Sequence, residues 1–362
     1  MESNHTNLRI PGPTPVTPEI LKEMSRFMIN HRGDEFRQLI ESVTERLKKI
    51  YETKQDLHIL TASGTGAMET AIVNTLSPGD NVLAITIGAF GDRFANIAEI
   101  YGADVTILRS ALGESTDPDK VTSVLNNNPN IKAVLVTHNE TSTGVANDLE
   151  EISKVVKKEY ENKLLLVDGI SSVASLPTYM DLWGCDVIST AYQKGWMLQP
   201  GLAFVSFSDF AIESYKNSDM PKFYFDIGQY EKYFKMGQPP WTPAVSLMFA
   251  LDLALEQILK EGIENVYSRH KEIGEFTRDQ VRKIGFSILP EEKVASNTVT
   301  AVNVPDGYQA GELITFMKNN YDIVLAAGQG ELKEKIIRIG HMGKTTHDDI
   351  KPVIEGLSNF IS

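Results

Sequence analysis

The chain of 362 residues is 42% hydrophobic, 23% charged and 8% aromatic, a composition typical of a globular protein with a buried core rather than a disordered one. At roughly 100–200 residues per domain, this length predicts two or three domains that need no disulfides or structural metals to fold. The net charge of −13 repels phosphate backbones and anionic membranes, so we do not expect nucleic acid as a partner.

The single cysteine, Cys185, excludes an intrachain disulfide, and one cysteine with seven scattered histidines gives no Cys/His metal cluster. Residues 1–6 lack the basic start and apolar run of a signal peptide. No apolar stretch reaches the about 20 residues that a membrane-spanning helix needs. We therefore expect a cytoplasmic protein without a membrane partner.

The first strong pattern along the chain is helical. Apolar residues recur at helical spacing from Phe36 to Ile50, directly behind Gly33-Asp34, and predict a helix with one buried face.

Between residues 57 and 207, short aliphatic or β-branched runs alternate with longer amphipathic ones. This alternation favours βαβ units and a mostly parallel sheet, so we predict an α/β fold. The predicted strands are 57–61, 81–86, 104–108, 131–137, 164–168, 186–190 and 202–207.

Beyond the sheet, two long helices are predicted at 243–260 and 263–283. The remaining pattern indicates a smaller α+β domain, with strands at 298–304, 323–326 and 335–340 and helices at 310–318 and 346–360. We predict a large N-terminal domain at residues 1–258 and a small C-terminal domain at 259–362.

Ligands of open parallel sheets bind at the carboxyl ends of the strands. After the first strand, Ser63-Gly64-Thr65-Gly66 precedes a helical stretch, where backbone N–H groups and the helix dipole favour a phosphate; an ordinary turn and helix cap explains the segment equally well. Glu69 stands where a dinucleotide fingerprint has its third glycine, and no Gly-Lys-Ser/Thr of a P-loop follows. Nicotinamide-dependent oxidoreduction is therefore disfavoured.

Two ionisable residues follow apolar strands. Asp168 comes after the run 163–167, where a desolvated carboxylate needs a partner. It is either a helix cap or an anion that keeps a heteroaromatic nitrogen protonated. Lys194 follows strand 186–190 beside Gly195; it is either a surface charge or a desolvated amine suited to Schiff-base chemistry.

Three further features lie near predicted strands. The polar segment 138–144 follows strand 131–137 and is either a surface loop or part of a site. Phe90, between small residues, is either a core side chain or a ring that stacks on a flat cofactor. Arg338, flanked by apolar residues, is either half of a structural ion pair or a bidentate carboxylate ligand.

Taken in order, these segments resemble the class V aminotransferases, pyridoxal phosphate enzymes of the alanine–glyoxylate and serine–pyruvate type with fold type I. The similarity covers nearly the whole chain. It is carried by residues 10–14 (Ile-Pro-Gly-Pro-Thr), 88–93 (Gly-Ala-Phe-Gly-Asp-Arg), 138–144 (His-Asn-Glu-Thr-Ser-Thr-Gly), 166–168 (Leu-Val-Asp), 193–194 (Gln-Lys) and 338–343 (Arg-Ile-Gly-His-Met-Gly).

The resemblance implies the cofactor pyridoxal 5′-phosphate and a role for each matching residue. Lys194 would bind the cofactor covalently, Asp168 would pair with its pyridine nitrogen, and Phe90 would stack on its ring. The phosphate would be held by Ser63, Gly64, Thr65 and Gln193, and Thr141 would contact the hydroxyl side of the ring. Arg338 would bind the substrate carboxylate, and Thr242 would come from the neighbouring subunit of a homodimer.

The resemblance also implies an activity: transfer of the amino group of alanine or serine to glyoxylate or pyruvate. A 2-aminoethylphosphonate–pyruvate transaminase would share the same motifs. A cysteine desulfurase needs a reactive cysteine on a mobile loop, and Cys185 precedes a buried strand instead. The non-enzyme alternative is an inactive α/β interaction subunit, against which the presence of both Lys194 and Asp168 speaks.

Overall fold

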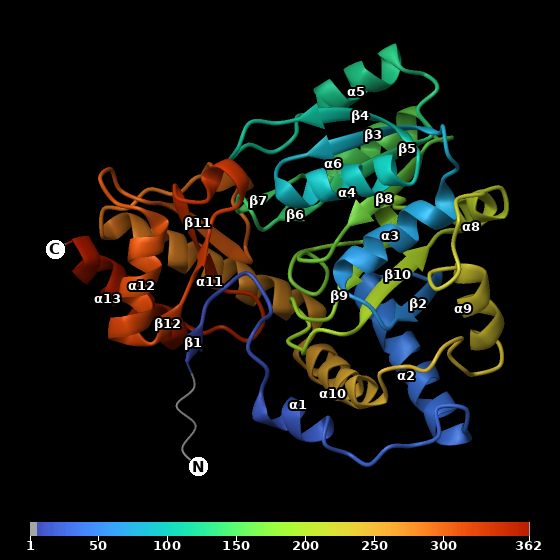
Figure 1. Cartoon of the computed structure of the whole chain (residues 1–362), viewed down its shortest axis with the longest axis horizontal. Helices are drawn as coiled ribbons and strands as arrows, with labels where there is room; N and C mark the ends of the chain where they lie inside the picture. The colour runs from blue at the N-terminus through green and yellow to red at the C-terminus, as the bar shows by residue number, and fades with distance from the viewer. Residues whose placement is uncertain (1–5, 362) are drawn as a thin grey trace.

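The computed structural model describes residues 6–361; residues 1–5, which carry most of the segment interpreted as lacking a signal peptide, lie outside the described part. Its centre is a seven-stranded sheet in the order β2-β10-β9-β8-β5-β3-β4 (Figure 1). The strands are β2 (Asp56–Leu60), β3 (Asn81–Thr86), β4 (Asp104–Arg109), β5 (Ala133–Thr137), β8 (Leu164–Asp168), β9 (Val187–Ala191) and β10 (Ala203–Phe207). All seven predicted strands are present: β3 and β8 have the predicted bounds, and the ends of the other five differ by at most two residues.

The prediction of a mostly parallel sheet is confirmed. β10 alone runs antiparallel to both of its neighbours in this sheet, β2 and β9, and the other neighbouring pairs are parallel. The two faces of the sheet are covered by separate hydrophobic cores. Along β3, Leu83 and Ile85 pack into one core and Val82 and Ala84 into the other. Because both faces are buried, the central strands are apolar throughout instead of alternating with polar residues.

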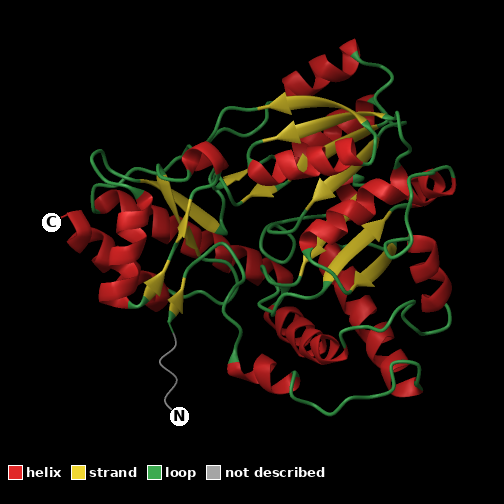
Figure 2. Cartoon of the chain, viewed as in Figure 1, coloured by secondary structure: helices red, strands yellow, loops and turns green. Residues whose placement is uncertain are grey.

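Helices make both covering layers (Figures 1 and 2). One core includes residues of α2 (Asp34–Tyr51) and α10 (Val245–Glu261), and the other includes residues of α3 (Gly64–Thr75) and α4 (Ala89–Ile100). The remaining helices of this part are α1 (Pro18–Glu23), α5 (Pro118–Asn127), α6 (Leu149–Lys154) with the π-helical η1 (Val155–Glu159), α7 (Met180–Trp183), α8 (Asp209–Lys216) and α9 (Ile227–Phe234). Phe36, Leu47 and Ile50 of α2 are buried, as the predicted apolar face requires.

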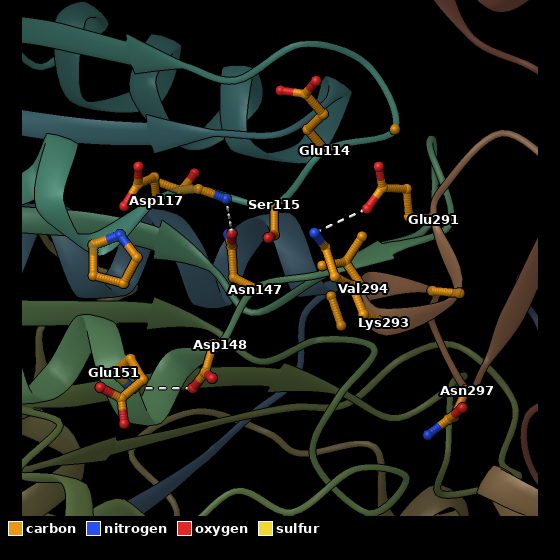
Figure 3. A pocket seen from close by; sticks show the side chains of 15 residues that line it. Glu114, Ser115, Asp117, Asn147, Asp148, Glu151, Glu291, Lys293, Val294 and Asn297 are labelled. Carbon is orange, nitrogen blue, oxygen red and sulfur yellow. Dashed lines mark hydrogen bonds and ion pairs between the residues drawn. The ribbon is translucent and has the colours of Figure 1, made fainter.

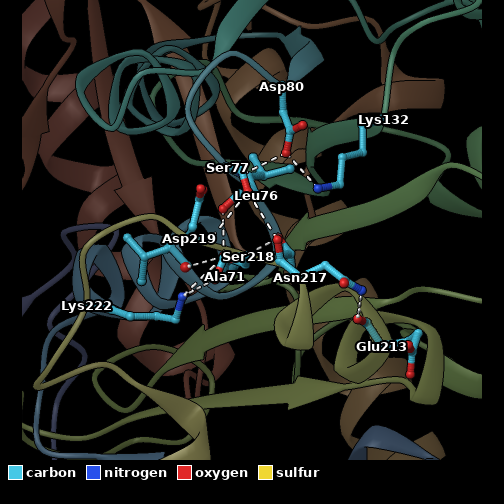
Figure 4. Close-up of polar contacts among 12 residues, drawn as sticks. Ala71, Leu76, Ser77, Asp80, Lys132, Glu213, Asn217, Ser218, Asp219 and Lys222 are labelled. Atoms are coloured by element: carbon cyan, nitrogen blue, oxygen red, sulfur yellow. Dashed lines mark hydrogen bonds and ion pairs between the residues drawn. The ribbon is translucent and has the colours of Figure 1, made fainter.

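The C-terminal end of α3 is fastened by polar contacts (Figure 4). Ser218 Oγ donates to the carbonyl oxygens of Val73 and Leu76 at 2.9 and 2.7 Å. The turn that follows is closed by Asp80, whose carboxylate accepts the N–H of Ser77 at 2.7 Å and pairs with Lys132 at 2.6 Å. These contacts fasten the far end of α3, whose first residue, Gly64, packs against Ala191 at the end of β9.

The C-terminal part has its own sheet and core. β11 (Val299–Asn303), β14 (Ile336–Gly340) and β13 (Ala326–Ala327) form an antiparallel sheet, and residues of α11 (Ile263–Lys283), α12 (Ala310–Tyr321) and α13 (His347–Ile361) share one core with it. Two short 3-10 turns, η2 (Glu292–Val294) and η3 (Gly330–Leu332), lie in its loops. The division of the chain at residues 258 and 259 stays a prediction.

Two expectations need correction. The predicted strand 323–326 is two strands, because β12 (Ile323–Val324) pairs with the N-terminal β1 (Asn7–Leu8) whereas β13 pairs with β14. The segment 138–144 is not a surface loop: it contains β6 (Asn139–Glu140), which pairs with β7 (Val145–Ala146), and all seven of its residues are buried. Among residues 6–361, no helix is both long and apolar enough to cross a membrane.

Candidate active site

Asp168 is the last residue of β8 and is 3% exposed. Its Oδ2 accepts the Thr137 hydroxyl at 3.2 Å and its Oδ1 accepts the N–H of Ile170 at 3.0 Å. Burial raises the pKa of Asp168 to about 6, and the nearby charge of Glu140 acts in the same direction. The alternative of a helix cap is wrong, since the chain continues in turns and the next α-helix begins at Met180. No cationic side chain in the described part of the chain, residues 6–361, is bonded to this carboxylate.

Lys194 follows β9 and is only 9% exposed, so the alternative of a surface charge is wrong. Its Nζ donates a short hydrogen bond to the carbonyl oxygen of Pro11. The pKa of Lys194 is lowered to about 8, mainly by burial and also by the positive charge of Arg338, although the negative charges of Asp168 and Glu140 act in the opposite direction. The amine therefore loses its proton much more readily than an ordinary lysine.

The backbone around Lys194 is tightly packed. A Cβ on Gly195 would lie 2.1 Å from Ser175 Oγ, so only glycine fits there. On the other side, the N-terminal segment crosses over the lysine: Thr14 N–H donates to Gln193 O at 3.1 Å and Thr14 Oγ1 donates to Lys194 O at 3.1 Å. The lysine thus leaves the sheet between two fixed segments of backbone.

The N-terminus of α3 forms a polar cradle. Ser63 is the N-cap residue, but its side chain makes no capping bond, and the first turn of α3 holds no acidic residue. The N–H groups of the first turn are therefore available to an anion. Gly64 packs against the Asp168 turn, because a Cβ there would lie 2.7 Å from Ile170 Cδ1. Gln193 adds a buried Oε1 that has no hydrogen-bond partner among residues 6–361.

Phe90 lies in the first turn of α4 and is half-buried, and it belongs to none of the hydrophobic cores, so the alternative of a core phenylalanine is wrong. Its N–H and that of Gly91 donate to Glu140 Oε2 at 2.8 and 3.1 Å. The guanidinium of Arg93 lies 4.8 Å from the ring centroid. The Phe90 ring, which follows the end of β3, is therefore partly exposed.

Arg338 lies in β14 and is 7% exposed. Its Nε donates to Ala327 O at 2.8 Å and its Nη1 to Thr141 O at 3.0 Å. It forms no salt bridge within residues 6–361, and its Nη2 has no hydrogen-bond acceptor there, so the alternative of a structural ion pair is wrong. The arginine is oriented by two carbonyl oxygens and keeps donors for an anionic ligand.

The structure brings these predicted residues together, apart from Thr242. The charges of Asp168 and Arg338 both shift the pKa of Lys194, and Gln193 adjoins Lys194. Phe90 donates its N–H to Glu140, the residue before Thr141, and Thr141 O accepts a bond from Arg338. Thr242 is exposed and makes no hydrogen bond to the other predicted site residues.

Two residues of the site were given no role from the sequence. Glu140 is fully buried and accepts N–H bonds from Phe90, Gly91 and Ser142. Arg93 donates from Nη1 to Thr65 Oγ1 at 3.3 Å. Both residues lie within segments that carry the family resemblance. The position of Glu140 shortly after an apolar strand, where burial is expected, is the sequence signal that could have identified it.

A separate cavity of about 730 Å³ contains none of the predicted site residues (Figure 3). Its polar groups are bonded to one another: Asn147 Oδ1 accepts the N–H of Thr116 at 2.8 Å, Asp148 accepts that of Glu151 at 3.0 Å, and Lys293 pairs with Glu291 at 2.9 Å.

Comparison with known proteins defines the class. The family model described as aminotransferase class-V matches residues 7–353, and the chain belongs to this family. It is a pyridoxal phosphate-dependent aminotransferase of fold type I.

Three individual proteins illustrate the similarity. The small subunit of a soluble hydrogenase from Synechococcus sp. (strain PCC 6716) is 41% identical over 98% of this chain and 92% of its own. L-aspartate–glyoxylate aminotransferase from Paracoccus denitrificans is 37% identical over 93% of this chain and 86% of its own. The crystal structure of alanine–glyoxylate aminotransferase from Nostoc sp. superposes with a TM-score of 0.95 at 29% identity, over 100% of this chain and 97% of that one.

The residues around Lys194 fit pyridoxal phosphate. A buried amine whose pKa is about 8 suits covalent attachment to an aldehyde, and a buried carboxylate suits a protonated ring nitrogen. The N–H groups in the uncapped first turn of α3 are donors that a phosphate site would use.

Proposed function

We propose that this enzyme moves the amino group of a small amino acid, alanine or serine, to a 2-oxo acid, glyoxylate or pyruvate. The names of two relatives support glyoxylate as the acceptor, since both an aspartate–glyoxylate and an alanine–glyoxylate aminotransferase are similar to this chain. The observation that carries the proposal is the buried Lys194 amine beside the Asp168 carboxylate and the Arg338 guanidinium.

When bound, pyridoxal phosphate withdraws electrons from the substrate Cα, which acidifies the Cα–H bond. We propose that Lys194 Nζ holds the cofactor and, once the substrate amine has displaced it, takes and returns this proton, because its lowered pKa leaves a useful fraction of neutral amine near pH 7. Asp168 would hold a proton on the ring nitrogen by its negative charge.

Arg338 would orient the substrate. Two of its donors are occupied by Ala327 O and Thr141 O, which fixes the plane of the guanidinium and leaves Nη2 for the carboxylate common to amino and 2-oxo acids. Thr141 would contact the hydroxyl side of the ring, and Phe90 would stack on it. Ser63, Gly64, Thr65 and Gln193 would hold the phosphate.

We further propose a homodimer in which Thr242 of the neighbouring subunit completes the phosphate site. Large apolar side chains are exposed in the segment between α1 and α2, where Phe27 is 96% exposed, and before α9, where Phe223 is 74% exposed. Arg32 ties the first of these segments to the chain just before Thr242, by a 2.9 Å bond to Pro239 O. The proposed compartment is the cytoplasm.

Other chemistries have less support. Cys185 is buried and its thiol pKa is raised by burial, which is unfavourable for a sulfur nucleophile. A 2-aminoethylphosphonate transaminase would use the same lysine and carboxylate. One relative is named as a subunit of a soluble hydrogenase, which is the observation that favours the alternative of an interaction subunit.

The purified protein should be yellow, and borohydride reduction followed by peptide mass spectrometry should find the cofactor on Lys194. Assays with alanine, serine, aspartate and 2-aminoethylphosphonate against glyoxylate and pyruvate then identify the substrate pair. A protein without a visible band even after addition of pyridoxal phosphate would contradict the proposed enzyme, and turnover of the phosphonate alone would replace the proposed donor.

A further inference from the structure

The cradle that we assign to the cofactor phosphate has no positive charge of its own. Ser63, Gly64, Thr65 and Gln193 offer neutral donors only, and the chain as a whole carries a net charge of −13. A phosphate monoester is close to a dianion at neutral pH. Neutral donors and the dipole of α3, equivalent to roughly +0.5 elementary charge, therefore leave most of the phosphate charge uncompensated.

Arg93 is bonded directly to this cradle. Its Nη1 donates to Thr65 Oγ1 at 3.3 Å, and Thr65 lies in the first turn of α3. Its guanidinium lies 4.8 Å from the centroid of the Phe90 ring, one helical turn earlier on α4. Arg93 thus spans the space between the proposed phosphate residues and the proposed stacking residue.

The charge of Arg93 is not neutralised by any carboxylate among residues 6–361. It forms no salt bridge with any residue between 6 and 361, unlike Arg109, whose Nη1 lies 2.7 Å from Asp92 Oδ1. The positive charge of Arg93 is also felt by Lys194, whose pKa it lowers. An unpaired guanidinium at the edge of the cradle is free to turn its remaining donors toward an anion.

We infer that Arg93 is a phosphate-binding residue of the cofactor site, which supplies the positive charge that the other cradle residues lack. The inference rests on the proposed function, because it takes the first turn of α3 as the phosphate site. The alternative is that Arg93 only supports the Phe90 ring by a cation–π contact.

These two roles differ in how they respond to the phosphate itself. Apoprotein should be titrated with pyridoxal 5′-phosphate and, separately, with unphosphorylated pyridoxal, with absorbance and protein fluorescence as readouts. If Arg93 binds phosphate, Arg93→Met should weaken pyridoxal phosphate about 10–100-fold, as the loss of a hydrogen bond to a charged group predicts, and change the affinity for pyridoxal less than about twofold. Arg93→Lys should restore part of the difference, because it keeps the charge.

Arg109→Met is the matched control. Arg109 pairs with Asp92 of α4, the helix that also carries Arg93, but does not contact the phosphate cradle. Its loss should leave the affinities for pyridoxal phosphate and for pyridoxal near the parental values. A parental preference for the phosphorylated form in Arg93→Met would overturn the inference, and so would an equal loss of affinity for both compounds, which would assign Arg93 to the ring. Failure of the unmodified protein to bind either compound would instead contradict the proposed function.

Discussion

The carboxylate of Glu140 in β6 accepts the backbone N–H of Phe90 in α4 at 2.8 Å. The same carboxylate accepts the N–H groups of Gly91 and Ser142 at 3.1 and 2.9 Å. The next residue, Thr141, accepts a bond from Arg338. The proposed ring-stacking and carboxylate-binding side chains are therefore held by neighbouring residues of one buried segment, which fixes their relative positions.

Glu140→Ala should lower both stability and cofactor affinity. It leaves three N–H groups without an acceptor, and an unsatisfied buried donor costs about 1–3 kcal/mol. We expect chemical denaturation to show a loss of at least this size, and titration with pyridoxal phosphate to show weaker binding, since Phe90 is no longer fixed. Glu99→Ala is the control, because Glu99 is an exposed glutamate on α4, the helix that carries Phe90. If the two variants behave alike, Glu140 does not position Phe90.

A second prediction concerns the contact between Gly12 and Lys194. Gly12 has φ +119°, and a Cβ there would lie 2.7 Å from Lys194 Nζ. Gly12→Ala should therefore displace the amine and prevent attachment of the cofactor, in addition to a backbone strain of about 1–3 kcal/mol.

Gly79→Ala separates these two effects. Gly79 has φ +85°, but nothing lies within 4 Å of the position of its Cβ. This variant should show strain alone: a lower melting temperature with cofactor attachment retained, as measured by borohydride reduction and mass spectrometry. Normal attachment in a folded Gly12→Ala protein would show that the segment does not constrain the lysine.

The third prediction is the pH dependence of cofactor attachment. Only the neutral amine of Lys194 attacks an aldehyde, and its pKa is lowered to about 8. Below this pKa the neutral fraction grows roughly tenfold per pH unit, so the rate at which apoprotein takes up pyridoxal phosphate should rise steeply and level off above about pH 8. Stopped-flow absorbance measures this rate.

Two variants should shift the midpoint of this pH–rate profile, the pH at which the uptake rate is half its maximum, in opposite directions. Asp168 raises the pKa of Lys194 by its negative charge, and Arg338 lowers it by its positive charge. The midpoint should consequently fall in Asp168→Asn and rise in Arg338→Gln. Shifts with the reverse signs would mean that other groups control the protonation of the amine.

The elements that could be predicted from the sequence are those whose residues face a hydrophobic core on both sides. β3 and β8 were predicted with their bounds unchanged because their apolar runs are continuous and end at turn residues. Lys194 and Asp168 stood out for the same reason, as charged residues directly after such runs. Their burial follows from the strands that precede them.

What could not be predicted depends on tertiary partners. The strand 323–326 changes partner at Leu325, from β1 to β14, and nothing local in the sequence specifies this. The segment 138–144 is polar in composition, and its burial comes from bonds to distant residues such as Thr298 and Ile87. The bond of Arg93 to Thr65 joins two helices that follow different strands, so no sequence spacing encodes it.

The fourth prediction concerns Arg338. Arg338→Ala should raise the KM for amino acids and for 2-oxo acids alike, since both carry the carboxylate that Nη2 would bind, and the loss of a charged hydrogen bond predicts an increase of about 10–100-fold. Affinity for pyridoxal phosphate should change little. An unchanged KM for both substrates would remove the carboxylate assignment, and steady-state kinetics with each substrate varied in turn decides the matter.

The last prediction is that Asp168 makes the apoprotein less stable as the pH rises. Its pKa is about 6 in the folded protein and near 3.8 when unfolded. Between these values the unfolded chain has released the proton that the folded chain still holds, so the unfolding free energy falls with increasing pH, by an amount on the order of 3 kcal/mol. Denaturation at several pH values should show this slope, and Asp168→Asn, which keeps a hydrogen-bond acceptor but cannot ionise, should reduce it. The same variant should turn over about 10–100-fold more slowly when loaded with cofactor, because the amide no longer supplies a negative charge to the ring nitrogen. A variant that keeps both the parental slope and the parental rate would show that this carboxylate neither titrates as proposed nor takes part in the reaction.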